Sequence, residues 1–184
     1  MTSLKGHLLL ATPRLIEPIF ARSVILMLDH TEEGAAGLIL NRPTEATLAA
    51  ISADVFEEPS DWEKAVTLGG PVPGPLVILH KVAELSDQEV IDGVYTTVDT
   101  DKVRALVRDQ PEPSLAVANY SGWGPGQLEG EIAEGTWFSL PARVNLVFWE
   151  GTGDLWKSAV KEYNARTLTS MLHVREVPDD PSVN

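Results

Sequence analysis

Short apolar runs, each ended by polar residues, glycine or proline, recur along most of the chain. Runs of this length with these boundaries are typical of buried strands. The first two runs are close enough to form a hairpin, whose loop over 30–34 has about five residues. The pattern predicts strands over 23–29, 36–40, 66–68, 76–80, 94–98, 115–120, 137–140 and 144–149.

Apolar residues at helical spacing mark the second type of segment. Leu48, Ile51 and Val55 share one face of a predicted helix, and Thr44 can cap its N-terminus. Residues 86–93 begin with the capping-box pattern Ser-x-x-Glu and end in glycine, so they predict another short helix. Further helices are predicted over 100–109, over 127–134, and after an N-cap at Asp154, where the shared face consists of Leu155, Trp156, Ala159, Val160 and Tyr163.

The order of these elements indicates the fold class. Strands and helices do not alternate regularly, which disfavours a doubly wound parallel sheet. The order favours an α+β fold with a mixed, mostly antiparallel sheet and about five helices packed around it. The chain has 184 residues and fits one domain, predicted over 1–172. Residues 173–184 contain Pro178 and Pro181 and are predicted to form a frayed C-terminal tail.

Charge and composition disfavour several classes of function. The net charge is −13, and the lysines and arginines are scattered singly. Direct nucleic-acid binding and adhesion to anionic membranes are therefore not expected, because both need a basic face. The sequence has no signal-peptide pattern and no apolar run near the ~18 residues of a membrane span, so a cytoplasmic location is expected. The absence of cysteine removes disulfides, thiolate metal sites and cysteine nucleophiles.

The densest titratable cluster is Asp-His-Thr-Glu-Glu at 29–33. A histidine beside carboxylates is suited to general-base catalysis or to metal binding, which makes His30 and Glu32 candidate site residues. The alternative is a solvated hairpin turn with ordinary surface groups. No other part of the chain supplies obvious further ligands, so no metal site and no cofactor are predicted.

Two other segments have candidate functional residues. Asn41 and Arg42 end a strand before Pro43, so Arg42 can project from a rigid corner and bind an anion, or pair with one of the many acids. The glycine-rich segment 121–126 leads from a strand into a helix N-terminus, where anions can bind; the alternative is that its glycines serve only the backbone conformation. Trp123 in this segment is either a packing residue or a stacking platform.

Four segments together resemble the YqgE/AlgH-like family of bacterial proteins. They are Leu4–His7 with Phe20–Val24, His30–Pro43, Gly69–Val72 and Tyr120–Glu129, in the order in which the family has them. The resemblance implies an α+β fold with a bifurcated sheet curled into a pseudo-barrel. It implies no established activity, although some family members are labelled transcriptional regulators. The matching positions that we take as the candidate functional surface are His30, Glu32, Asn41, Arg42, Tyr120, Trp123 and Gln127.

Three hypotheses for the function follow. The first is a non-enzymatic binding or accessory domain for a protein partner or small ligand, with a groove or apolar patch near Trp123. The second is a hydrolase-like enzyme that uses His30 with Glu32 and holds an anionic substrate through Arg42, which requires these segments to meet in one pocket. The third, by family label only, is a regulator that does not contact DNA directly.

Overall fold

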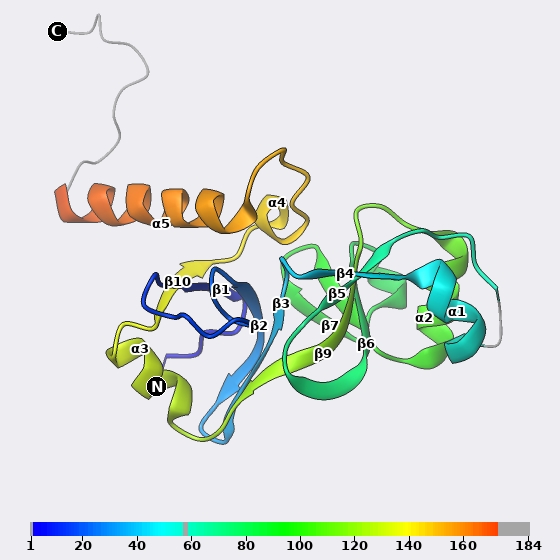
Figure 1. The fold of residues 1–184 in the computed structure, drawn as a ribbon, viewed down its shortest axis with the longest axis horizontal. Coiled ribbons are helices and arrows are strands. Elements are labelled where there is room, and N and C mark those ends of the chain that lie inside the picture. The colour runs from blue at the N-terminus through cyan, green and yellow to red at the C-terminus, as the bar shows by residue number, and fades with distance from the viewer. Residues whose placement is uncertain (1, 57–58, 173–184) are drawn as a thin grey trace, which may run out of the picture.

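The computed structural model of the protein describes residues 2–56 and 59–172. Within these ranges, a ten-stranded sheet is accompanied by five α-helices and one short 3-10 helix, η1 (Figure 1). In chain order the elements are β1 (His7–Ala11), β2 (Val24–Thr31), β3 (Gly34–Ile39), β4 (Pro43–Thr47), α1 (Leu48–Phe56), β5 (Ala65–Leu68), β6 (Val72–His80), η1 (Ala83–Leu85), β7 (Gln88–Ile91), β8 (Val94–Thr97), α2 (Thr100–Asp109), β9 (Leu115–Trp123), α3 (Gln127–Ala133), β10 (Trp137–Pro141), α4 (Val144–Val147) and α5 (Leu155–Leu172).

The sheet divides at β9. Its strand order is β10-β1-β2-β3-β9-β6-β8-β7, and neighbours on this path are antiparallel. The C-terminal half of β9 pairs with β3, and its N-terminal half pairs in parallel with β5, which also pairs with β4. The predicted α+β fold with a mixed, mostly antiparallel and bifurcated sheet is therefore confirmed.

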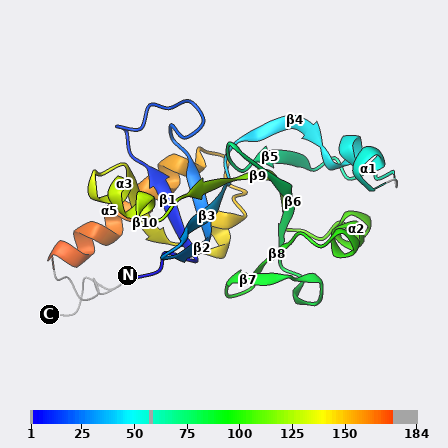
Figure 2. The same cartoon turned by 90° about the horizontal axis from the view of Figure 1, so that it is seen from below.

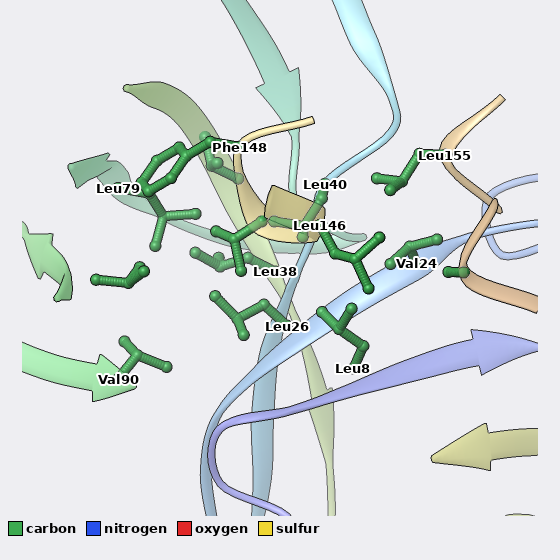
Figure 3. Packing of buried hydrophobic residues seen from close by; sticks show 14 of the residues in the cluster. Leu8, Val24, Leu26, Leu38, Leu40, Leu79, Val90, Leu146, Phe148 and Leu155 are labelled. Carbon is green, nitrogen blue, oxygen red and sulfur yellow. The ribbon is translucent and has the colours of Figure 1, made fainter. Parts of the chain in front are cut away.

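The sheet curls into a half-barrel around one apolar core. Strand β7 returns toward β2, where the Nε2 amide of Gln88 donates a hydrogen bond of 3.2 Å to the backbone oxygen of Leu28. Figure 3 shows side chains from opposite sides of the curl, such as Leu26 and Val90, pointing into the same space. The segment over α4 and the first turn of α5 covers the open end of this core with Leu146, Phe148 and Leu155.

Two smaller cores lie on the outer faces of the sheet. Helix α3 packs Leu128 against Leu9 and Ile25 of β1 and β2. Helices α1 and α2 pack Leu48 and Leu106 against the β5–β6 part, at the end of the molecule opposite to α3 and α5 (Figure 2). The apolar face predicted for α5 is confirmed, because all five of its predicted residues, from Leu155 to Tyr163, belong to the main core or pack against it.

The point where the sheet divides depends on close backbone contacts. Asn119 of β9 has a left-handed backbone with φ 63°, and its Oδ1 accepts a hydrogen bond of 3.3 Å from the Gly74 amide. A Cβ atom on Gly69 would lie 2.4 Å from the backbone oxygen of Asn119, and one on Gly70 would lie 2.3 Å from the carbonyl carbon of Tyr120. Only glycine lets the 69–70 backbone approach β9 this closely.

The helix predicted to begin at Thr44 is partly wrong. Residues 43–47 form β4, and α1 begins at Leu48. Pro43 is the first residue of this strand and lies opposite Thr67, a position where proline is tolerated. The Thr44 hydroxyl donates to the Val66 oxygen at 2.7 Å, so it supports the β4–β5 pair and does not cap a helix.

Three other local predictions are corrected. Within 86–93, residues 88–91 form β7, which pairs with β8 in a hairpin in place of the predicted helix. The Asp87 carboxylate accepts hydrogen bonds from the amides of Val98 and Asp99 and so supports this arrangement. The segment 144–147 is the short helix α4, since a short apolar run alone does not distinguish a strand from a helix. His30 lies within β2, so the β2–β3 turn consists only of Glu32 and Glu33. Trp123 is the last residue of β9 and does not lie in a glycine-rich turn.

The prediction of a frayed tail over 173–184 lies outside the described residues, and the domain limit at 172 stays a prediction. No helix within the described ranges is long and apolar enough to cross a bilayer.

His80 makes the stability of the fold depend on pH. Its ring is fully buried, its Nδ1 accepts from the Val82 amide at 3.1 Å, and its Nε2 therefore donates to the Thr97 hydroxyl at 2.8 Å. Burial lowers the pKa of His80 below its ordinary value, and Asp87 offsets part of this effect. The neutral ring is the form that fits.

We expect the free energy of unfolding to fall as the pH drops below about 6.5, because His80 binds a proton in the unfolded chain but stays neutral in the native protein. The loss attributable to His80 is at most about 1.4 kcal/mol per pH unit, and it is absent above about pH 7. Urea unfolding between about pH 7.5 and 5.5 measures it. A His80→Gln variant, which lacks this titration, should show a shallower slope; equal slopes would contradict the assignment.

Candidate functional site

His30 is a buried link between three segments. Its Nδ1 accepts a hydrogen bond of 3.0 Å from the Leu4 amide, so the proton is on Nε2, which lies 3.1 Å from the Glu129 Oε1 of α3. The His30 oxygen accepts a further bond from the Ser3 hydroxyl at 3.0 Å. Its predicted partner Glu32 lies exposed in the turn. With both ring nitrogens used internally, His30 anchors the N-terminal segment and α3 to the hairpin.

Helix α3 is attached to the sheet by a second carboxylate, which sequence reasoning missed. Glu131 Oε2 accepts hydrogen bonds from the indole nitrogens of Trp123 at 2.9 Å and Trp137 at 2.7 Å. Gln127 donates to the other Glu131 oxygen at 2.8 Å and accepts from the Gly124 amide at 3.1 Å. The spacing of Gln127 and Glu131 by four residues was the signal available in the sequence. Trp123 is therefore a buried packing residue with a satisfied indole.

Asn41 and Arg42 form a second, separate cluster. The Asn41 side chain accepts from the Val24 amide at 3.0 Å and donates to the Arg22 oxygen at 2.8 Å. The Arg42 guanidinium donates to the backbone oxygens of Asn41 and Ala21. Beside it, Arg22 is paired with Asp154. The cluster borders an open pocket of about 400 Å³.

The electrostatics of this corner are balanced internally. Burial lowers the pKa of Arg42 from its ordinary value, Arg22 lowers it further, and Asp154 raises it. The guanidinium stays charged at neutral pH, because arginine is not deprotonated in proteins. Its hydrogen bonds to two carbonyl groups hold the chain corner before Pro43, and its use as an anion holder stays a prediction.

The two clusters lie at opposite ends of one hairpin. Asn41 is bonded to Val24 at the start of β2, whereas His30 lies opposite Ala35 near the turn. Six residues of strand separate the two points, which is roughly 20 Å. The pocket beside Arg42 has no lining residue from the hairpin turn or from β9. The convergence that the hydrolase hypothesis requires is thus not found among the described residues.

Tyr120 lies in a third place. Its ring covers Gly74 and Gly122, and it lines a shallow, open pocket of about 400 Å³ on the β2–β3–β9 surface. Gln127 is exposed at the start of α3. Among the described residues, the groove predicted near Trp123 corresponds to this shallow depression. Of the seven candidate residues, the structure brings together His30, Trp123 and Gln127 around α3, and separately Asn41 with Arg42.

A larger site lies at the open end of the half-barrel, and we call it the mouth cleft. It consists of two adjoining pockets of about 460 and 650 Å³. Both are lined by Pro113, Phe148, Trp149 and Glu150, which form their shared wall. The first pocket is lined further by the β5 residues Ala65 and Thr67, by Leu40 just after β3, and by residues of β4, β9 and the start of α5.

The wall of the mouth cleft is fixed by its own loop. The Trp149 indole donates to the Gly153 oxygen at 3.1 Å. A Cβ atom on Gly151 would lie 2.2 Å from the Trp149 ring, so the loop can fold against the ring only with glycine there. The sequence signal is an aromatic pair followed by Gly151 and Gly153, but the apolar run before them predicts a strand over 144–149.

The chemistry of the mouth cleft suits apolar groups. Phe148 and Leu155 are buried at its wall, and Thr67 is 2% exposed. The Thr67 hydroxyl has no hydrogen-bond partner among the described residues, and the side chain lines the pocket. Within the same ranges, no group of three or more histidine, aspartate or glutamate side chains could hold a metal ion.

The fold and these sites define an α+β half-barrel protein with a bifurcated sheet. The sequence profile of the AlgH-like family matches residues 8–167. The chain belongs to this family, which confirms the resemblance noted in the sequence.

Similar proteins cover nearly the whole chain. A UPF0301 protein of Xanthomonas campestris is 38% identical over 165 residues, 86% of this chain and 88% of that protein. A UPF0301 protein of Streptomyces avermitilis is 35% identical and covers 100% of this chain and 97% of its own length. The solution structure of the AlgH protein from Pseudomonas aeruginosa superposes with a TM-score of 0.74 at 28% identity, covering 96% of each chain.

Proposed function

We propose that this protein is a non-enzymatic binding domain whose mouth cleft holds a large apolar group of its ligand. The observation that carries the proposal is the cleft itself, with a mostly apolar and aromatic lining, a volume of about 460 Å³ in the pocket beside β5, and a Thr67 hydroxyl that has no hydrogen-bond partner among the described residues. Ligand sites are typically of this size and have a few polar groups among apolar ones.

The arrangement of the titratable groups favours binding over catalysis. His30, the predicted base, makes its ring hydrogen bonds to Leu4 and Glu129, far from the cleft. The carboxylates that line the cleft, Glu112 and Glu150, have no histidine beside them in the lining. A regulator that acts through a protein partner would use the same cleft, so that hypothesis becomes a special case of this one.

Filling the cleft tests the proposal. Ala65 is exposed, lines the pocket and lies on the same face of β5 as Thr67, so Ala65→Leu places a side chain in the space that the ligand needs. The matched control is Ala46→Leu, the same change on exposed β4, outside the lining. The probes are isopentanol and 4-methylphenol, which represent leucine and tyrosine side chains.

We expect both probes to shift the amide signals of Thr67 and Leu115 saturably in two-dimensional NMR spectra. Ala65→Leu should weaken this binding about tenfold or more, because burial of such a group contributes about 1.5–3 kcal/mol. Ala46→Leu should bind as the unaltered protein does. Equal binding by both variants, or the absence of shifts at the cleft in the unaltered protein, would refute the proposal.

A further inference from the structure

We propose that the occupant of the mouth cleft is an extended cationic segment of a partner protein, with two large apolar side chains separated by one residue. One side chain enters each pocket, and the long side chain of a flanking lysine or arginine reaches back to the exposed Glu150. This inference rests on the proposed function and adds the chemical nature of the partner.

The shape of the cleft favours two side chains over one compact molecule. Its two pockets, of about 460 and 650 Å³, adjoin each other, because Pro113, Phe148, Trp149 and Glu150 line both. Alternate side chains of an extended segment lie on the same face, about 6.6–7 Å apart, and can straddle a wall one side-chain layer thick. A single small molecule would fill one pocket and leave the other open.

The charge at the cleft favours a cationic segment. Lys64 is the only lysine or arginine that lines either pocket, and its Nζ is paired with Glu112 Oε1 at 2.5 Å. Glu150 lines both pockets, is exposed, and makes no ion pair with any described residue. The net lining charge is therefore negative. The net charge of −13 also attracts cationic partners over longer distances.

The wall is suited to such a segment in a second way. Trp149 is only partly buried, and its indole nitrogen is already bonded to the Gly153 oxygen, so the accessible part of the ring is apolar. An aromatic ring beside a carboxylate favours an ammonium or guanidinium group through its electron-rich face. Trp149 and Glu150 together therefore provide both contacts that a flanking lysine or arginine needs.

The test is a calorimetric titration of the full chain with five-residue peptides, acetylated and amidated. The main probe is Lys-Leu-Lys-Leu-Lys. Glu-Leu-Glu-Leu-Glu reverses the charge, Gly-Leu-Gly-Leu-Gly removes it, and Lys-Lys-Leu-Leu-Lys keeps the composition but puts the leucines on opposite faces. The protein variants are Glu150→Gln and, as the matched control, Glu84→Gln, which removes the same charge at an exposed position outside the cleft.

We expect Lys-Leu-Lys-Leu-Lys to bind most tightly. Glu150→Gln should weaken it about two- to fivefold, as is typical of one exposed ion pair, without changing the affinity for the glycine peptide. Glu84→Gln should have no effect on either peptide. The peptide with adjacent leucines should bind more weakly than the main probe, because only one leucine reaches the cleft.

Each contrary result has a separate meaning. Equal affinity for the cationic and anionic leucine peptides overturns the cationic partner but leaves the proposed function intact. Equal affinity for the two lysine peptides overturns the extended, two-pocket arrangement. If no leucine peptide binds, and isopentanol shifts the cleft signals, the occupant is a small molecule and the inference is wrong. If isopentanol also fails, the proposed function itself is wrong.

Discussion

Replacing Gly70 with alanine is expected to lower the free energy of unfolding by about 3–5 kcal/mol, the range of the most damaging single substitutions. The new Cβ would lie 2.3 Å from the carbonyl carbon and oxygen of Tyr120 and 2.4 Å from the Ser121 nitrogen. These are backbone atoms of β9, which pairs with β3, β5 and β6. Because three strands hold β9, neither side can move away without breaking ladder hydrogen bonds.

The matched control for this variant is Gly130→Ala. Gly130 lies within α3, and a Cβ atom there would meet no described atom within 4 Å beyond its chain neighbours and the backbone of its own helix. The same chemical change should stabilise the protein by about 0.5–1 kcal/mol, because alanine restricts the unfolded chain and favours helix. Urea unfolding curves of both variants measure the difference. A Gly70→Ala protein within about 1 kcal/mol of the unaltered one would show that the backbones do not approach as described.

The parts of the fold that could be predicted from the sequence have local causes. The N-cap of α2 is Asp99, whose carboxylate accepts from the amides of Asp101 and Lys102, and Asp154 accepts from the Lys157 amide at the start of α5. These bonds form within one turn of helix, so the adjacent residues specify them. The strands β2, β5 and β10 likewise correspond to apolar runs with clear polar limits.

The β7–β8 hairpin could not be predicted, because distant contacts determine it. Ser86 and Glu89 have the capping-box spacing, but Val90 and Val94 fill the half-barrel with residues of β1, β2 and β3. Burial of these two side chains in a shared core outweighs a local preference of about 1 kcal/mol. No pattern within 86–97 shows that β2 lies next to β7.

The candidate site follows the same division. His30, Trp123 and Gln127 were identified from family motifs, and they do gather, but around the attachment of α3. The residues of the mouth cleft come from separate parts of the chain, such as Thr67, Pro113 and Trp149. None of these residues belongs to a distinctive sequence motif, so the site can be recognised only in the folded chain, where they line one pocket.

Replacing Glu131 with alanine is the second change with a large expected effect. It should lower the free energy of unfolding by about 2–4 kcal/mol, because the buried indoles of Trp123 and Trp137 both lose their charged acceptor. The two rings also pack edge to face, with 6.1 Å between their centroids, so a shift of one ring disturbs the other. Urea unfolding gives the energy, and the indole N–H signals of the two tryptophans report the loss of the bonds directly.

Glu134→Ala separates this effect from a general effect of alanine at the end of α3. Glu134 is exposed at the C-cap, and its side chain has no hydrogen bond to a described residue, so its loss should change stability by less than about 0.5 kcal/mol. Glu131→Gln should fall between the two variants, because the amide oxygen can still accept from the indoles while its nitrogen faces the Gln127 amide group, also a donor in this contact. If Glu131→Ala matches Glu134→Ala, the carboxylate does not attach α3 to the sheet, and Leu128 packing with the His30–Glu129 contact must hold the helix.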